Sequence, residues 1–194
     1  MTTGRSRLLR SYGPWSMTER IKLIHARFTP DGGGLVISQV RDAVMNLWTQ
    51  NLQTGNSRQL TYDGEGAGFP TVSDDGRWIA FEVMRGGDVH LAIVPSSGGE
   101  ARVLTSGRGL YWPHSFAPDG ERIAVAYRTD GLWRLGAISR TTGQLVPLSA
   151  PVPASSFVRY PAWSARNDRI VYEHAQVTGN IWMATLGGPT GTRD

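Results

Sequence analysis

The sequence predicts an all-β fold, a β-propeller of about four four-stranded antiparallel blades that is either closed or incomplete. A pattern of apolar run, Asp-Gly turn and second apolar run recurs along the chain, with spacings of 44, 44 and 47 residues between copies. Segments with the period of a helix are nearly absent, and 24 glycines and 11 prolines suit frequent turns. A fixed period of this length is typical of propellers, solenoids and repeat arrays.

Each copy of the pattern predicts a β-hairpin. The copies begin at Phe28, Val72, Phe116 and Trp163. Asp-Gly pairs follow at Asp31, Asp75 and Asp119, and Arg166-Asn167 stands at this place in the fourth copy. We expect a tight turn there because Asp and Gly can both adopt positive φ, and Asn also tolerates this region. The next run, such as Trp78-Ile79-Ala80-Phe81, is rich in β-branched and aromatic residues, which favours a strand.

Two further strands are expected to complete each blade. The third strand is predicted to place Trp48, His90, Trp133 and Trp182 in one register. Since His90 replaces a tryptophan in this alignment, a packing role is predicted for it. The fourth strand is expected at 58–61, 102–105 and 145–148. Four strands in a repeat of about 40–50 residues are the signature of a propeller blade.

The same residues resemble a known family. An apolar residue, a small residue, Pro-Asp-Gly and an apolar strand resemble the WD40-like (PD40) repeat of TolB-type propellers, over residues 24–188. Phe28-Thr29-Pro30-Asp31-Gly32 is among the closest matches, whereas the second copy has Asp74 in place of proline. The resemblance implies six blades and a scaffold that binds other proteins. It does not define a function, because such repeats also occur in peptidases, kinases and transcriptional regulators.

The predicted organisation is a basic arm at 1–19 without fixed structure, blades over 20–188, and a tail at 189–194. Residues 20–25 alternate partly and are expected to form a strand that completes the last blade. At 194 residues the chain is too short for six blades of 44 residues. A closed four-bladed ring, an open arc and an assembly between chains are all compatible with the sequence. An open arc would expose strand edges that can pair with another chain.

Composition limits the functional classes. The chain has no cysteine, which excludes disulfides and thiolate metal sites. Residues 1–27 hold six basic side chains and one acidic one, a net charge of +5, which leaves −1 for the rest of a chain of net charge +4. The propeller body is therefore not expected to bind nucleic acid, and the basic arm is interpreted as a solvated tail. No apolar segment follows the N-terminal arginines, so we expect a cytoplasmic protein, or a periplasmic one if the true N-terminus lies upstream.

The sequence contains no recognisable catalytic motif. It lacks a Gly-x-Ser-x-Gly elbow, and Gly64–Gly68 lacks the Lys-Ser/Thr ending of a phosphate loop. The four histidines show no metal-ligand spacing, and the Asp-Gly aspartates are interpreted as turn residues rather than calcium ligands. No cofactor, no metal and no enzymatic activity are therefore predicted.

The candidate binding surface consists of loops between blades. The loops at 62–70, 106–114 and 149–161 are expected to gather on one face. Aromatic and arginine side chains there, of the kind enriched at binding hot spots, are the predicted partner-binding residues: Phe69, Arg108, Tyr111, Trp112, His114, Arg159 and Tyr160. Packing at a blade seam is the alternative for each of them.

The leading hypothesis is a non-catalytic scaffold that binds a protein or peptide through these loops. The alternative is a sensor or substrate-gating propeller within a larger peptidase, kinase or transcriptional regulator. A channel-centred hydrolase is a third hypothesis, which only the fold favours.

Overall fold

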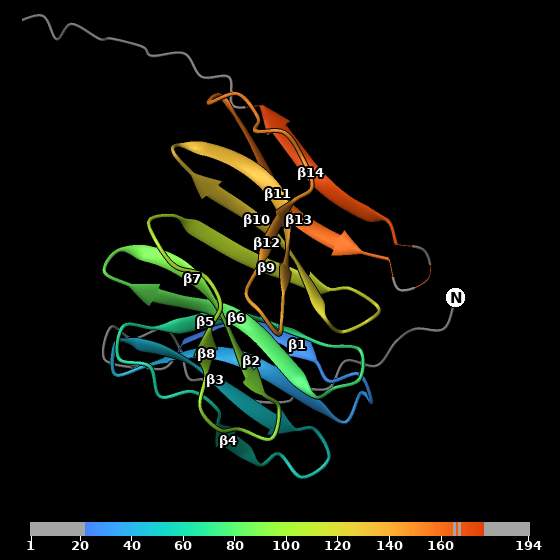
Figure 1. The fold of residues 1–194 in the computed structure, drawn as a ribbon. Helices are drawn as coiled ribbons and strands as arrows, with labels where there is room; N and C mark the ends of the chain where they lie inside the picture. The colour runs from blue at the N-terminus through green and yellow to red at the C-terminus, as the bar shows by residue number, and fades with distance from the viewer. Residues whose placement is uncertain (1–21, 165, 167, 177–194) are drawn as a thin grey trace, which may run out of the picture.

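The computed structural model describes residues 22–164, 166 and 168–176, which form an all-β structure (Figure 1). Blade 1 consists of β1 (Lys22–Phe28), β2 (Gly34–Arg41), β3 (Val44–Asn51) and β4 (Ser57–Gln59). Blade 2 consists of β5 (Ala67–Val72), β6 (Trp78–Arg85), β7 (Asp88–Pro95) and β8 (Arg102–Val103). Blade 3 consists of β9 (Leu110–Phe116), β10 (Arg122–Thr129), β11 (Leu132–Ser139) and β12 (Leu145–Pro147). The described strands of blade 4 are β13 (Ser156–Trp163) and β14 (Ile170–Gln176).

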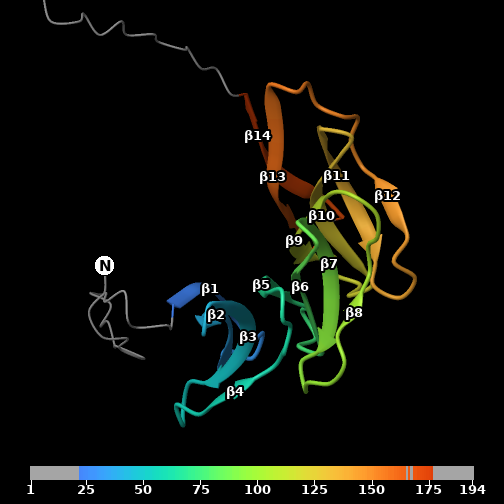
Figure 2. The same cartoon turned by 90° about the vertical axis from the view of Figure 1, so that its left-hand side faces the viewer.

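The described blades form an arc, with blade 1 and blade 4 at opposite ends (Figures 1 and 2). The first strand of each blade contacts the first strand of the next: β1 contacts β5, β5 contacts β9, and β9 contacts β13. Within each blade the neighbouring strands are antiparallel. The predicted propeller of four-stranded antiparallel blades is confirmed.

A recurring hydrogen bond holds the short outer strands of blades 1 to 3. The backbone N–H groups of Leu47, Leu91 and Leu135 donate to the hydroxyl oxygens of Thr61, Thr105 and Ser149, over 2.9, 3.1 and 3.0 Å. These positions are 44 residues apart from blade to blade. The hydroxyl satisfies a backbone donor just beyond the last ladder pair of the outer strand, where an unpaired N–H would be costly.

The hydrophobic core lies between blades. Blades 1 and 2 enclose Val36, Leu47, Leu60, Ile79, Phe81, Val83 and Val94. Blades 2 and 3 enclose Leu91, Ile93, Tyr111, Phe116, Ile123, Val125 and Ile138. A smaller cluster of Ala126, Leu135 and Val158, with Trp133 against it, joins blades 3 and 4. Each blade therefore depends on its neighbours to bury its faces, as expected of a repeat architecture.

The Asp-Gly turns differ from the predicted two-residue turns. Only the glycines have positive φ, at 69°, 70° and 67° for Gly32, Gly76 and Gly120. Each aspartate instead accepts a hydrogen bond from the backbone N–H two residues later, as from Arg77 to Asp75 over 3.0 Å. The longer turn forms because an Asp side chain can replace a backbone acceptor. The two-residue turns with positive φ at both positions lie between the second and third strands, as at Asp130-Gly131.

The predicted register of the third strands is wrong. Trp48 lies opposite Ile37, whereas the strand pairing gives Ala92 and Gly136 the same place in blades 2 and 3. His90 corresponds to Asn46 rather than to a tryptophan. The prediction aligned residues with large rings. The residues that repeat every 44 positions in the structure are the leucines whose N–H groups donate the outer-strand hydrogen bonds. A side chain at Gly136 has no room, since its Cβ would lie 2.7 Å from Leu145 and 2.9 Å from Tyr127.

The segment 20–25 was predicted to complete the last blade, but its described residues belong to blade 1. Residues 22–28 form β1, the first strand of blade 1, and pair with β2 from Lys22↔Val40 to Phe28↔Leu35. Phe28 occupies the place of Phe116 in blade 3, so this segment belongs to the repeat rather than preceding it. The predicted arm at 1–19, Asn167, Trp182 and the tail at 189–194 lie outside the described residues.

Candidate functional site

The C-terminal part of each predicted inter-blade loop is strand: 67–70 belongs to β5, 110–114 to β9 and 156–161 to β13. Six of the seven predicted partner-binding residues lie on β5, β9 or β13, and only Arg108 lies in a turn, where it is exposed. The prediction took these stretches as connections between the outer strand of one blade and the first strand of the next, and it began each first strand too late. Gly68, Pro70 and Pro161 lie in the parts that are strand. In the structure these residues accompany β-bulges, which are typical where a strand changes direction.

Two of the predicted residues are packing residues. Tyr111 is 7% exposed and stacks between His90 and Tyr127, with ring centroids 6.1 and 6.0 Å away. The ring centroids of Trp112 and Trp133 are 4.5 Å apart. Tyr111 therefore belongs to the core between blades 2 and 3, and Trp112 is half-buried against the third strand of its own blade.

The first strands, which contact one another in order, carry two pairs of rings that we call the inner-strand row: His25 with Phe69, and His114 with Tyr160, one ring from each blade. The His25 and Phe69 rings are 5.5 Å apart, and the His114 and Tyr160 rings are 5.4 Å apart in an edge-to-face contact. Phe69 is 39% exposed and Tyr160 is 59% exposed. The row thus offers accessible aromatic surface between two imidazoles.

Bulges aim the side chains of the row. Phe69 and Tyr160 have φ of 50° and 52°, and each lies where the pairing with the next strand skips a residue. His114 is the extra residue in the pairing of β9 with β10. A bulge turns one side chain out of the regular alternation along a strand. Here the first strands of blades 2, 3 and 4 each contain a bulge.

The row carries basic groups. Burial first, and the charges of Arg27 and His25 next, lower the pKa of His114 to about 4. Burial and the Arg27 charge also lower the pKa of His25. His114 is therefore a neutral ring at pH 7, held beside two groups of positive or potentially positive charge. At the blade 4 end, Arg159 binds Glu173 through two contacts of 2.6 and 3.0 Å and lies over the Tyr160 ring.

His25 and Arg27 were not among the predicted site residues. The sequence did hold a signal for His25, since it lies one 44-residue period before Phe69. The assignment of residues 20–25 to the last blade concealed this equivalence. The influence of Arg27 on His114 has no local sequence signal, because the two lie on strands of different blades.

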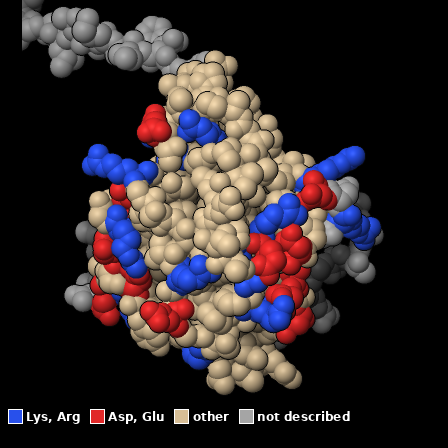
Figure 3. Space-filling view, viewed as in Figure 1, with Lys and Arg blue, Asp and Glu red and all other residues tan. Residues whose placement is uncertain are grey.

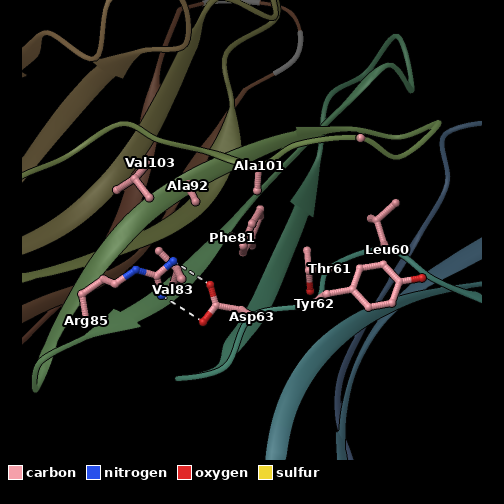
Figure 4. A pocket seen from close by; sticks show the side chains of 11 residues that line it. Leu60, Thr61, Tyr62, Asp63, Phe81, Val83, Arg85, Ala92, Ala101 and Val103 are labelled. Carbon is pink, nitrogen blue, oxygen red and sulfur yellow. Dashed lines mark hydrogen bonds and ion pairs between the residues drawn. The ribbon is translucent and has the colours of Figure 1, made fainter.

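Apart from the inner-strand row, a hollow lies in the seam between blades 1 and 2 (Figure 4). It has a volume of about 250 Å³, and its apolar wall includes Phe81, Val83 and Ala92. The carboxylate of Asp63 binds the Arg85 guanidinium at one end, over 2.6 and 2.9 Å. Although partial burial works to raise the pKa of Asp63, Arg85 and backbone N–H groups outweigh it and lower that pKa. Because these charges satisfy each other across the seam, we interpret the hollow as a blade junction.

On the face shown in Figure 3, basic and acidic side chains alternate along both margins of the arc, and the middle over blades 3 and 4 is largely uncharged. Large single-sign fields are therefore absent from the described part of this face. Across residues 22–164, 166 and 168–176, no three His, Asp or Glu side chains form a group able to hold a metal ion. The described chain also has no helix with the length and apolarity to span a membrane.

A half-buried acid next to the row makes stability depend on pH. Glu82 lies opposite Gly68 on β6, and burial raises its pKa from 4.5 to about 8. Its folded pKa exceeds the unfolded one, so its contribution is complete below pH 4.5 and is lost as the pH rises towards 8. We expect Glu82→Gln to unfold at higher urea than the native protein at pH 8, with a difference that shrinks by pH 5. The exposed Glu100→Gln serves as control, and equal pH profiles for all three proteins would contradict the assignment.

Residues 19–188 match the family model of the TolB beta propeller domain. The chain belongs to this PD40 family. The TolB structure from Acinetobacter baumannii superimposes with a TM-score of 0.68 over 82% of this chain and 39% of that one, at 19% identity. That identity supports the shared fold alone.

Two curated relatives of this TolB-type propeller are longer proteins that it matches only in part. It is 28% identical to the uncharacterized protein Atu1656 of Agrobacterium fabrum over 82% of its own length and 57% of that protein. It is 35% identical to the uncharacterized peptidase YuxL of Bacillus subtilis over 56% of its length and 18% of YuxL. The chain therefore spans little more than half of the first relative and under a fifth of the second.

Proposed function

We propose that this TolB-type propeller is a non-catalytic scaffold that holds a protein or peptide segment against the inner-strand row. The observation that carries the proposal is that two pairs of rings, drawn from four blades, lie on first strands that contact one another, with Phe69 and Tyr160 substantially exposed. Exposed aromatic side chains on a rigid framework are favourable anchors, because few rotamers are lost when they are covered.

The strands beneath the row support this role. Ser115 donates a hydrogen bond to the Pro161 carbonyl over 3.2 Å and accepts one from the Trp163 N–H over 2.8 Å, which ties β9 to β13. Tyr111 and Trp112 of β9 pack against the Tyr127 ring of β10 and the Trp133 ring of β11. A partner would therefore meet a preformed surface, with little ordering cost on the propeller side.

Site-specific photo-crosslinking in the source cells tests the proposal. A benzophenone amino acid at Phe69 or Tyr160 is expected to crosslink one discrete partner, whereas the same group at Tyr62, which is 80% exposed outside the row, is not. With the partner purified, Phe69→Ala with Tyr160→Ala should weaken binding at least tenfold, as expected for hot-spot aromatics at about 1–2 kcal/mol each. Equal crosslinking at Tyr62, or none at either row position, would refute the proposal.

A second candidate is a propeller part of a larger peptidase. The similarity to YuxL favours it, and so does the outward side of blade 4, where Val171 is 70% exposed. An antibody against this chain distinguishes the two on a blot of native extract. A band at the mass of 194 residues supports the separate scaffold, whereas a much larger band supports the peptidase.

A further inference from the structure

Glu82 is a half-buried carboxylic acid without a partner. The described part of the chain gives its side chain no hydrogen bond and no ion pair, and burial raises its pKa to about 8. The carboxyl group is not sealed, because the unpaired side-chain atoms closed to solvent among the described residues belong to Gln39, Trp48 and His114. An acid that is costly to bury unpaired and is still open to solvent calls for an explanation.

Blade 4 contains the same arrangement with a partner in place. Arg159 on β13 lies opposite Glu173 on β14, as Gly68 on β5 lies opposite Glu82 on β6. In both blades the next residue of the first strand is the aromatic residue of the row with positive φ, and the pairing skips it together with the proline that follows. The two acids therefore occupy the same backbone setting.

The difference between the two sites is the side chain opposite the acid. Arg159 donates two hydrogen bonds to the Glu173 carboxylate, over 2.6 and 3.0 Å, and its guanidinium carbon lies 5.0 Å from the centroid of the Tyr160 ring. In blade 2 the corresponding residue is a glycine, so this position supplies no guanidinium. Glu82 thus has the register and the aromatic neighbour of Glu173 but lacks the cation.

The geometry points to a cation subsite at Glu82, which takes an arginine side chain of the partner segment beside the Phe69 ring. This inference rests on the proposed function and specifies the chemistry of the partner. A guanidinium can donate two parallel hydrogen bonds to one carboxylate and lie over an aromatic face, as Arg159 does in blade 4. Phe69 is partly exposed, so a partner can reach this ring from outside.

Binding should release a proton from Glu82. A bound guanidinium favours the ionised carboxylate, so the pKa of Glu82 falls from about 8 and the carboxyl group loses its proton at pH 7. The other titratable groups on β6, on the strands that contact it and against Phe69 are Arg85, Asp88, His90, Tyr111, His114 and His25. A proton lost from any of these would still be released by Glu82→Gln, so this variant identifies the source.

The test uses the full chain and three probes: acetyl-Gly-Arg-Gly amide, its citrulline counterpart, which is neutral and of similar shape, and calcium chloride. Titration calorimetry at pH 7 in two buffers of different ionisation enthalpy measures binding and proton release together. We expect the arginine peptide to bind at least about tenfold more tightly than the citrulline peptide and to release most of one proton. Glu82→Gln should remove both the preference and the release, whereas the exposed Glu100→Gln should leave them unchanged.

A second variant supplies the cation from within the chain. Gly68→Arg reproduces the blade 4 pair in blade 2, and it is combined with Met45→Ala because a Cβ at Gly68 would meet the end of the Met45 side chain. The double variant should neither bind the arginine peptide nor release a proton, because its own guanidinium occupies the carboxylate. Met45→Ala alone should still do both.

Three outcomes would overturn the inference. They are equal or undetectable binding of the two peptides at millimolar concentration, a proton release that persists in Glu82→Gln, and tighter binding of calcium than of the arginine peptide. If crosslinking at Phe69 and Tyr160 still succeeds, only the cation subsite is refuted. If crosslinking also fails, the proposed function fails with it.

Discussion

Phe81→Ala is expected to lower the free energy of unfolding by about 3–5 kcal/mol, the usual cost of truncating a fully buried phenylalanine. Phe81 is 1% exposed on β6 and packs in the cluster shared by blades 1 and 2, with Leu47 and Leu60 from blade 1. Phe81 also lines the hollow in that seam, so few neighbouring side chains can move into the cavity that the substitution leaves. Urea denaturation monitored by tryptophan fluorescence measures the loss.

Phe28 provides the matched control for this substitution. It is a phenylalanine at the end of β1 but is 65% exposed, so Phe28→Ala should cost less than about 1 kcal/mol. Phe81→Leu, which retains most of the apolar volume, should fall between the two. A loss below about 1 kcal/mol for Phe81→Ala would mean that blades 1 and 2 do not pack through this ring.

Gly143→Ala is expected to destabilise by about 3 kcal/mol, through two separate effects. Gly143 has φ of 75°, a conformation that costs a non-glycine residue about 1–2 kcal/mol. A Cβ would also lie 2.6 Å from the Leu104 carbonyl oxygen, which belongs to blade 2, whereas Gly143 belongs to blade 3. The added methyl group would push these two blades apart at the outer edge of their seam.

Gly55 separates the two effects. It occupies the same turn in blade 1, with φ of 75° and a hydrogen bond to Asn51 that matches the one from Gly143 to Ser139. A Cβ at Gly55 would meet no atom within 4 Å. Gly55→Ala should therefore show the conformational cost alone, about 1–2 kcal/mol. Equal losses at the two glycines, measured by urea denaturation, would show that Gly143 is not confined by the neighbouring blade.

The comparison of sequence and structure shows which signals were local. The predicted outer strands at 58–61, 102–105 and 145–148 overlap β4, β8 and β12, because the glycine-containing turns before them are local and return the chain onto the third strand. The third-strand register failed at Trp48 and His90, where ring size suggested an equivalence that the backbone pairing does not have. The turn of a hairpin determines which residues pair across its two strands, so the size of one side chain does not identify the residue opposite it.

The candidate site shows the same division. Phe69, His114, Arg159 and Tyr160 were predicted as binding residues from their side-chain types, and the structure places all four on the first strands. Tyr111 was predicted beside them but is buried, because alternation along β9 turns it towards Tyr127. His25 was missed because residues 20–25 were assigned to the last blade, and Arg27 because its influence on His114 acts between strands of different blades.

The sequence by itself determined the all-β class, the 44-residue period and the four-stranded blade, because turn chemistry and apolar runs act over a few neighbouring residues. Only the tertiary structure decided which side chains form the row, which rings fill seams and where an imidazole is left without a partner. Those outcomes depend on bulges that redirect single side chains and on contacts between strands 44 or more residues apart. No local pattern encodes them, since the space at one blade is shaped by the packing of the next.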